Sequence, residues 1–235
     1  EAQAREMAHE LAVAPRERFA VVPLGLELDR FRSVDRREAG AGARRELGLA
    51  PDEVAVGMVG RLVPIKNHEL FLEALAALRE ELPVRGVVVG SGERERALRA
   101  YAAGLGLGDD AVLWLGWRRD LPRLYAALDV VALTSHDEGT PVALLEALAA
   151  GTRVVAREVG GVGEVLRDVG AGRLVPREAG PEAWARALKA ELEEAVRTPA
   201  RGLPDPVRSD VAHRYSVERL VADLATLYQE EMRIP

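Results

Sequence analysis

Short apolar runs alternate with amphipathic segments through most of the chain. Residues 54–59 are almost continuously apolar, as is typical of a strand buried on both faces of a parallel sheet. The next segment, which Asn67 can cap, repeats apolar residues at helical spacing as far as Leu78. The same alternation then predicts strands at 84–89, 111–115, 130–133, 153–156 and 173–175, and helices at 94–105, 121–128, 141–150 and 162–167. This order predicts an α/β domain in which right-handed βαβ units build a parallel sheet with helices on both faces.

The pattern is less regular towards the two ends. Residues 4–12 resemble the end of a helix, residues 19–22 predict a short strand that Pro23 ends, and residues 28–40 look polar and irregular. A short helix is expected at 44–49. The last part of the chain predicts helices at 181–197, 206–214 and 217–232, with residues 198–210, rich in proline, as the connector.

Composition narrows the class of protein. The chain has 235 residues, 48% of them hydrophobic and 30% charged, which is ordinary for a soluble globular domain. A net charge of -6 gives no support for a nucleic-acid partner, and the absence of cysteine excludes disulfides and thiolate metal sites. The four histidines show no ligand spacing, and no apolar run of about 18 residues predicts a transmembrane segment. We therefore expect a cytoplasmic protein without a metal, and, since the first residue is Glu, a piece of a longer chain.

The segment 138–147, Glu-Gly-Thr-Pro-Val-Ala-Leu-Leu-Glu-Ala, carries the most informative chemistry. Thr140 and Pro141 read as the N-cap and first residue of a helix. Glu138 stands just ahead of the free N–H groups of this helix start, where phosphate binds readily. Glu146 lies inside the apolar helix and needs a polar partner, because an unpaired buried carboxylate is costly. Two carboxylates that bracket an anion site could hold the sugar and the ribose of one ligand; alternatively, both are ordinary solvated acids.

A second loop follows the strand that ends at Val59. Gly60 permits a tight exit from the strand, and Arg61 and Lys66 bracket the start of the next helix. Arginine offers a planar fork and lysine a movable charge, so that together with a helix N-terminus they could neutralise a diphosphate. Lys66 is one of two lysines in the chain. Taken alone, the loop is equally consistent with ordinary surface cations.

Other motifs carry less weight. Gly90 and Gly92 follow a strand, but Glu95 stands where a dinucleotide fingerprint needs its third glycine, which excludes that cofactor site. Residues 160–163, Gly-Gly-Val-Gly, favour a plain connector over a pocket lining. Trp117 could face a nucleobase, but large aromatic side chains more often pack in a core, so packing is the expectation.

The two loops together resemble a known family, the retaining two-domain (B-fold) glycosyltransferases of group 1, which includes glycogen-synthase-like and mannosyltransferase-like enzymes. The resemblance is to the C-terminal, donor-binding half and covers residues 18–232. Its specific part is the spacing Glu-x7-Glu together with Gly-Arg-Leu-x3-Lys. The residues that carry it are Val59-Gly60-Arg61-Leu62 with Lys66, Gly90 and Gly92, 115–117, 125–131 and 138–151. The resemblance implies a single Rossmann-like domain.

The resemblance also implies roles for individual residues. Arg61 and Lys66 would hold the diphosphate of a nucleotide sugar and stabilise the leaving group, and Glu138 would bind the donor sugar; these three are the candidate catalytic residues. Glu146 would accept hydrogen bonds from the ribose. Further substrate contacts would come from Gly60, Gly139, Thr140, Val142 and Ala143, and base contacts from the backbone around Trp117 and Arg118. No metal or cofactor is implied, because fixed cations take that role.

The chain departs from the family pattern in two ways. Pro141 stands where many members have glycine, so one N–H contact to the ligand would be absent. An N-terminal, acceptor-binding half is also missing, so we expect residues 1–17 to be its remnant, residues 18–215 to be the nucleotide-sugar-binding domain, and residues 216–235 to cross back to it. The apolar stripe of that last helix would then pack on the missing half, or alternatively on the domain's own core. Its members are Leu220, Val221, Leu224, Leu227 and Tyr228.

The expected function is donor binding in a hexosyltransferase. The donor would be a UDP-, GDP- or ADP-linked sugar, and the acceptor would be recognised by the N-terminal half, through which the full-length enzyme could also attach to a membrane surface. The isolated domain would bind nucleotide but transfer sugar weakly or not at all. A nucleotide-sugar epimerase-like domain and a non-catalytic nucleotide-sugar-binding module are the alternatives; the paired motifs argue against the first.

Overall fold

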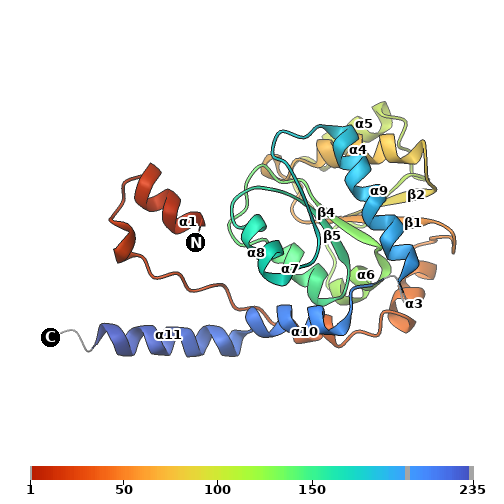
Figure 1. The fold of residues 1–235 in the computed structure, drawn as a ribbon. Coiled ribbons are helices and arrows are strands. Elements are labelled where there is room, and N and C mark those ends of the chain that lie inside the picture. The colour runs from red at the N-terminus through yellow and green to blue at the C-terminus, as the bar shows by residue number, and fades with distance from the viewer. Residues whose placement is uncertain (1, 199–201, 233–235) are drawn as a thin grey trace.

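The computed structural model describes residues 2–198 and 202–232 and contains one six-stranded parallel sheet (Figure 1). Its strand order is β3-β2-β1-β4-β5-β6, with every neighbouring pair parallel. The strands are β1 (Val54–Val59), β2 (Val84–Val89), β3 (Val112–Trp114), β4 (Val130–Leu133), β5 (Arg153–Arg157) and β6 (Arg173–Val175). All six lie where the alternation of apolar runs predicts them, and the Rossmann-like α/β fold is confirmed.

Helices cover both faces of the sheet because each strand between β1 and β6 is joined to the next by a helical crossover. One apolar core lies under α4 (His68–Arg79), α5 (Glu95–Gly104) and α9 (Pro181–Arg197), with Trp184 and Phe71 fully buried in it. The other core lies under the remaining helices of the body. These are α2 (Asp29–Arg32), α3 (Glu38–Glu46), α6 (Leu121–Ala127), α7 (Val142–Ala149), α8 (Val162–Val169) and α10 (Asp205–Arg214).

A buried arginine ties two helices of the second face together. The guanidinium of Arg36 donates to the carbonyls of Tyr125 and Leu128, at the end of α6, and to the carbonyl of Ala150, after α7. It also donates to the hydroxyl of Thr152 at 2.8 Å. Helix C-termini leave carbonyls without partners, and here one cation satisfies several of them at once. Helices α6 and α7 therefore keep a fixed relation, which matters below because each carries a residue of the candidate site.

Some local predictions are wrong. Residues 19–22 are not a strand: the backbone is extended at Phe19, but no neighbouring strand in the described residues pairs with it. Residues 28–40 are not irregular, because α2 and the first turn of α3 lie there, and the helix expected at 44–49 begins at Glu38. Packing explains α3, since its Gly40 lies directly on the carbonyl of Ala126 and tertiary contact outweighs the low helix propensity of glycine.

Two further boundaries differ from the prediction. Helix α7 begins at Val142, with Pro141 rather than Thr140 at the cap position and no side-chain capping bond. The connector expected at 198–210 contains the start of α10, and its residues 199–201 lie outside the described residues.

The last helix, α11 (Val217–Glu231), extends away from the body of the molecule (Figure 1). The N-terminal segment contains α1 (Ala2–Arg5), η1 (Glu6–Glu10) and η2 (Arg16–Arg18), and Arg5 of α1 pairs with Glu164 of α8 at 3.0 Å. None of the residues of α11 is buried, and Val221 and Tyr228 are 60% and 65% exposed. The alternative that its apolar stripe packs on the domain's own core is therefore wrong. No helix within the described ranges is both long and apolar enough to cross a bilayer.

Candidate functional site

The candidate site lies at the carboxyl ends of β1 and β4, where the strand order reverses. In open parallel sheets, ligands bind at this topological switch point, because the loops on either side diverge and leave a crevice. A pocket of about 280 Å³ opens there. Its lining residues are Val59, Gly60, Lys66, Leu133, Glu138, Thr140, Pro141, Val142, Ala143 and Glu146. The structure thus brings together seven of the predicted site residues from loops that are more than 70 positions apart in sequence.

The centre of the pocket is an ion pair between the two loops. Lys66 Nζ lies 2.5 Å from Glu138 Oε1, and Ser135 Oγ donates to the same oxygen at 2.6 Å. The Glu138 side chain is nearly buried, whereas Lys66 keeps about a quarter of its surface exposed. Glu138 Oε2 accepts no hydrogen bond from the described residues. The carboxylate is therefore held through one oxygen, and its second oxygen remains available for a ligand hydroxyl.

Hydrogen bonds from a side-chain hydroxyl and a backbone amide hold the Lys66 loop, which forms the short helix η3 (Pro64–Lys66), against the β4 loop. Thr134 Oγ1 donates to the carbonyls of Lys66 and Asn67 at 3.1 and 2.9 Å, and the His136 amide donates to the carbonyl of Ile65 at 2.8 Å. Asn67 takes a left-handed conformation, with φ of 51°, which asparagine tolerates better than most residues. The loop geometry is thus set by the protein before any ligand arrives.

At two positions only glycine fits, because another segment of backbone lies too close to leave room for a Cβ atom. A Cβ on Gly90 would lie 1.9 Å from the carbonyl oxygen of Gly60, and a Cβ on Gly160 would lie 1.8 Å from that of Glu138. The Gly161 amide donates to this same Glu138 carbonyl at 3.1 Å. The interpretation of residues 160–163 as a plain connector is therefore wrong, because this loop supports the backbone of the candidate sugar-binding residue.

Glu146 has the polar partner that its apolar surroundings predict. The buried hydroxyl of Tyr125 donates to Glu146 Oε2 at 3.1 Å, and Arg30 Nη2 lies 4.0 Å from Oε1. Burial raises the pKa of the Glu146 carboxyl, and the hydrogen bond from Tyr125 and the charge of Arg30 oppose that rise. The pKa of Tyr125 is raised well above its ordinary value, mainly by burial and also by the nearby carboxylate of Glu146. Tyr125 therefore stays protonated and acts as a hydrogen-bond donor to Glu146.

Four predicted residues do not line this pocket: Arg61, Gly139, Trp117 and Arg118. Arg61 is exposed, and its side chain forms no ion pair with any described residue. Trp117 is 65% exposed in the loop after β3, stacked with Arg119, so the prediction that it packs in the core is wrong. Arg118 is held by a bidentate pair with Asp120, at 2.8 and 2.6 Å, which raises its pKa.

Sequence reasoning missed the residues that support the site rather than line it. Ser135 and Tyr125 hold the two carboxylates, and Arg30 reaches Glu146 from a segment expected to be irregular. Only Tyr125 carried a signal, as part of the family resemblance. Within residues 2–198 and 202–232, no three His, Asp or Glu side chains are placed to hold a metal ion together.

The chain is similar in sequence to known proteins. The sequence profile described as "Glycosyl transferases group 1" matches residues 53–194. The chain is 36% identical over 225 residues to a D-inositol 3-phosphate glycosyltransferase of Segniliparus rotundus, and 40% identical over 229 residues to that of Salinispora tropica. These alignments include 92% and 91% of this chain but 48% and 46% of those proteins, so the chain spans about half the length of the curated relatives it matches.

Solved structures have the same fold. A structure of Anabaena Alr3699/HepE in complex with UDP-glucose superposes with a TM-score of 0.82 and 26% identity, covering 97% of this chain and 62% of that chain. A glycosyltransferase from Rickettsia africae superposes with a TM-score of 0.84 over 100% of this chain and 62% of that chain; at 18% identity, this likeness concerns the fold alone. On the profile match, which includes the strands and loops of the pocket, the chain belongs to the group 1 glycosyltransferase family.

Proposed function

We propose that this chain is the donor-binding half of a retaining glycosyltransferase, and that the pocket between the β1 and β4 loops binds a nucleotide-diphosphate sugar. The observation that carries the proposal is the juxtaposition of Lys66, Glu138 and Glu146 in one pocket at the switch point of the sheet. This set supplies a cation and two carboxylates, which match the phosphate, sugar hydroxyl and ribose hydroxyl groups of such a donor.

The charges suggest how the residues would act. Cleavage of the bond between the sugar and the diphosphate builds negative charge on the leaving group. Lys66 would stabilise that charge, and Arg61, which is exposed and without an ion-pair partner among the described residues, would turn towards it. Glu138, fixed by Ser135, would orient the sugar through its second oxygen. Glu146, fixed by Tyr125, would accept the ribose hydroxyls.

The backbone around the helix start would complete the donor site. The Val142 amide already donates to the Thr140 carbonyl at 2.9 Å, whereas the Ala143 amide forms no such bond with a described residue. Ala143 would therefore be the first amide offered to the phosphates, and Gly60, Gly139 and Thr140 would line the path of the ligand. Trp117 and Arg118, in the loop after β3, would meet the base. Among UDP, GDP and ADP, uridine is favoured, because the Anabaena protein was solved with UDP-glucose.

Residues 18–215 would form this donor domain. Residues 1–17 and 216–235 would belong to the interface with an acceptor-binding half, which fits the unburied helix α11 and the coverage of about half of each relative. The chain alone would then bind donor but transfer little or no sugar.

Transfer from UDP-glucose, measured as UDP release, tests the proposal in the full-length enzyme. Glu138→Gln should lower kcat on the order of 100-fold, because the neutral amide loses both the pair with Lys66 and its hold on the sugar. Glu158→Gln, an exposed acid after β5, is the matched control. Unchanged kcat in Glu138→Gln would refute the catalytic role, and rapid turnover by the present chain alone would refute the division into two halves.

A further inference from the structure

The pair between Lys66 and Glu138 joins two residues that the proposed function assigns to different parts of the donor. Lys66 would meet the diphosphate and Glu138 the sugar, yet in this structure each is the partner of the other, with Nζ and Oε1 2.5 Å apart. The Lys66 side chain forms no second hydrogen bond or ion pair within residues 2–198 and 202–232. Its charge is therefore offset by the carboxylate beside it, which lowers its attraction for a diphosphate.

Glu138 is the fixed member of this pair. Its side chain is nearly buried, and the hydroxyl of Ser135, itself fully buried, donates to the same oxygen at 2.6 Å. Its backbone is held too, because the Gly161 amide donates to the Glu138 carbonyl at 3.1 Å and a Cβ on Gly160 would lie 1.8 Å from that carbonyl oxygen. The protein thus fixes both the carboxylate and the backbone that carries it.

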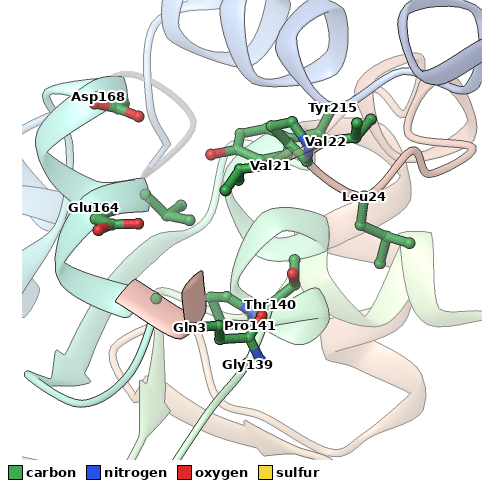
Figure 2. A pocket seen from close by; sticks show the side chains of 13 residues that line it. Gln3, Val21, Val22, Leu24, Gly139, Thr140, Pro141, Glu164, Asp168 and Tyr215 are labelled. Carbon is green, nitrogen blue, oxygen red and sulfur yellow. The ribbon is translucent and has the colours of Figure 1, made fainter. Parts of the chain in front are cut away.

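The turn that follows Glu138 is also held by the N-terminal helix. A second pocket, of about 280 Å³, borders this turn, and Gln3 of α1 lines it next to Gly139 (Figure 2). A Cβ on Gly139 would lie 2.8 Å from Nε2 of Gln3, and Arg5 of the same helix pairs with Glu164 of α8 at 3.0 Å. These contacts keep the turn in place beside the donor pocket.

Lys66 is the mobile member of the pair. About a quarter of its side chain is exposed, and its Cε lies 3.7 Å from the position that a Cβ on Gly60 would take, so the side chain reaches from the end of β1 to the loop after β4. A lysine has a flexible four-carbon stem, so its Nζ can turn to a new partner. When an anion draws Lys66 away, Glu138 therefore stays behind, with Ser135 as its remaining side-chain donor among the described residues.

We infer that the Lys66–Glu138 pair is exchanged when the donor binds, and that this exchange makes the pocket favour a nucleotide diphosphate that carries a sugar over the bare nucleotide diphosphate; the inference rests on the proposed function. A diphosphate that takes Lys66 leaves a nearly buried carboxylate without its counter-charge, which is costly. A sugar hydroxyl that donates to Glu138 offsets this cost. UDP alone brings no sugar hydroxyl to the carboxylate.

The same exchange favours release of the nucleotide product. Once the sugar has left for the acceptor, its hydroxyls no longer donate to Glu138, and the carboxylate attracts Lys66 back from UDP. The diphosphate then loses its contact with this cation. Glu138 thus acts on the sugar directly and on the leaving group through Lys66.

Calorimetric titration of the present chain with UDP and with UDP-glucose tests the inference. Glu138→Gln keeps the shape of the side chain and removes its charge, so this variant should bind UDP about 3- to 5-fold more tightly than wild type does, because no counter-charge holds Lys66. The affinity for UDP-glucose should not rise in parallel, since the sugar loses its carboxylate partner. Glu158→Gln, at an exposed position after β5, is the matched control and should leave both affinities unchanged.

A double-mutant cycle separates exchange of the pair from simple repulsion between Glu138 and the diphosphate. With exchange, Lys66→Met should weaken UDP binding about 3- to 5-fold more in the Glu138→Gln background than in wild type, because in wild type the cost of breaking the pair offsets part of what Lys66 contributes. Equal losses in the two backgrounds would overturn the inference. Circular dichroism establishes folding, and Glu138→Ala, which also removes the charge, takes the place of Glu138→Gln if that variant is unfolded.

Two further results would overturn the inference: unchanged or weaker UDP binding by the folded Glu138→Gln variant, or an equal rise in its affinity for UDP-glucose. The proposed function is judged on the wild type. Binding of UDP by the wild type without tighter binding by the variant would refute the exchange alone, whereas binding of neither ligand by either protein would refute both.

Discussion

At the scale of single residues, the site contains two largely buried carboxylates, and a hydrogen bond from a specific partner offsets the free-energy cost of burying each one. Glu146 illustrates this, because its apolar helix alone predicts that a partner exists, yet the identity of that partner, Tyr125, follows only from the way α6 packs beside α7. The same holds for Glu138 and Ser135. Trp117 shows the opposite failure: residue type favours burial, but its position in the loop after β3 leaves it exposed.

The raised pKa of Glu146 predicts a conflict between stability and binding. The pKa of Glu146 is higher in the folded than in the unfolded protein. At a pH above the pKa in the folded protein, the ionised carboxylate therefore lowers the free energy of unfolding. That free energy rises again as the pH falls through this pKa and the carboxyl takes up a proton. Glu146→Gln should therefore raise the free energy of unfolding at neutral pH by about 0.5–1 kcal/mol, yet weaken UDP binding at least tenfold. Urea unfolding and calorimetry measure the two effects. Loss of stability in this variant would show that the carboxylate is better compensated than we argue.

At the scale of elements, the sequence predicts the sheet well because most of its strands are apolar runs. It predicts the loops less well, because their conformation depends on contacts between segments far apart. The strand expected at 19–22 fails for lack of a neighbour to pair with, and α3 forms because Gly40 packs on α6. The two glycines of residues 160–161 read as a flexible connector until their contact with Glu138 is seen.

That contact gives an element-scale prediction. Gly160→Ala should lower the free energy of unfolding by about 1–3 kcal/mol and weaken UDP-glucose binding, because φ is 48° at this position and the added Cβ would push the Glu138 carbonyl away. Thermal unfolding and calorimetry measure both. Gly104→Ala is the control, since its Cβ would meet no atom within 4 Å. Equal behaviour of the two variants would mean that the Gly160 loop does not support Glu138.

At the scale of the whole molecule, α11 exposes apolar side chains that nothing in the described chain covers. Val221→Glu and Tyr228→Glu should therefore leave the thermal stability of this chain unchanged within about 0.5 kcal/mol, as exposed positions usually do. Val211→Glu, at a fully buried position of α10, should unfold the protein and serves as the contrast. In the full-length enzyme, the two α11 variants should lower stability or transfer. A large loss of stability in the present chain would place α11 against its own core.

The most direct test of the donor site is calorimetric titration of this chain with UDP, GDP and ADP. We predict one-site binding of UDP, weakened at least tenfold by Arg61→Ala and Glu146→Ala and unchanged in Lys189→Ala, which removes the chain's other lysine, on the surface of α9. Absence of binding to all three nucleotides by the folded chain, or equal affinity in the wild type and the two site variants, would contradict the assignment of the switch-point pocket as a nucleotide-sugar site.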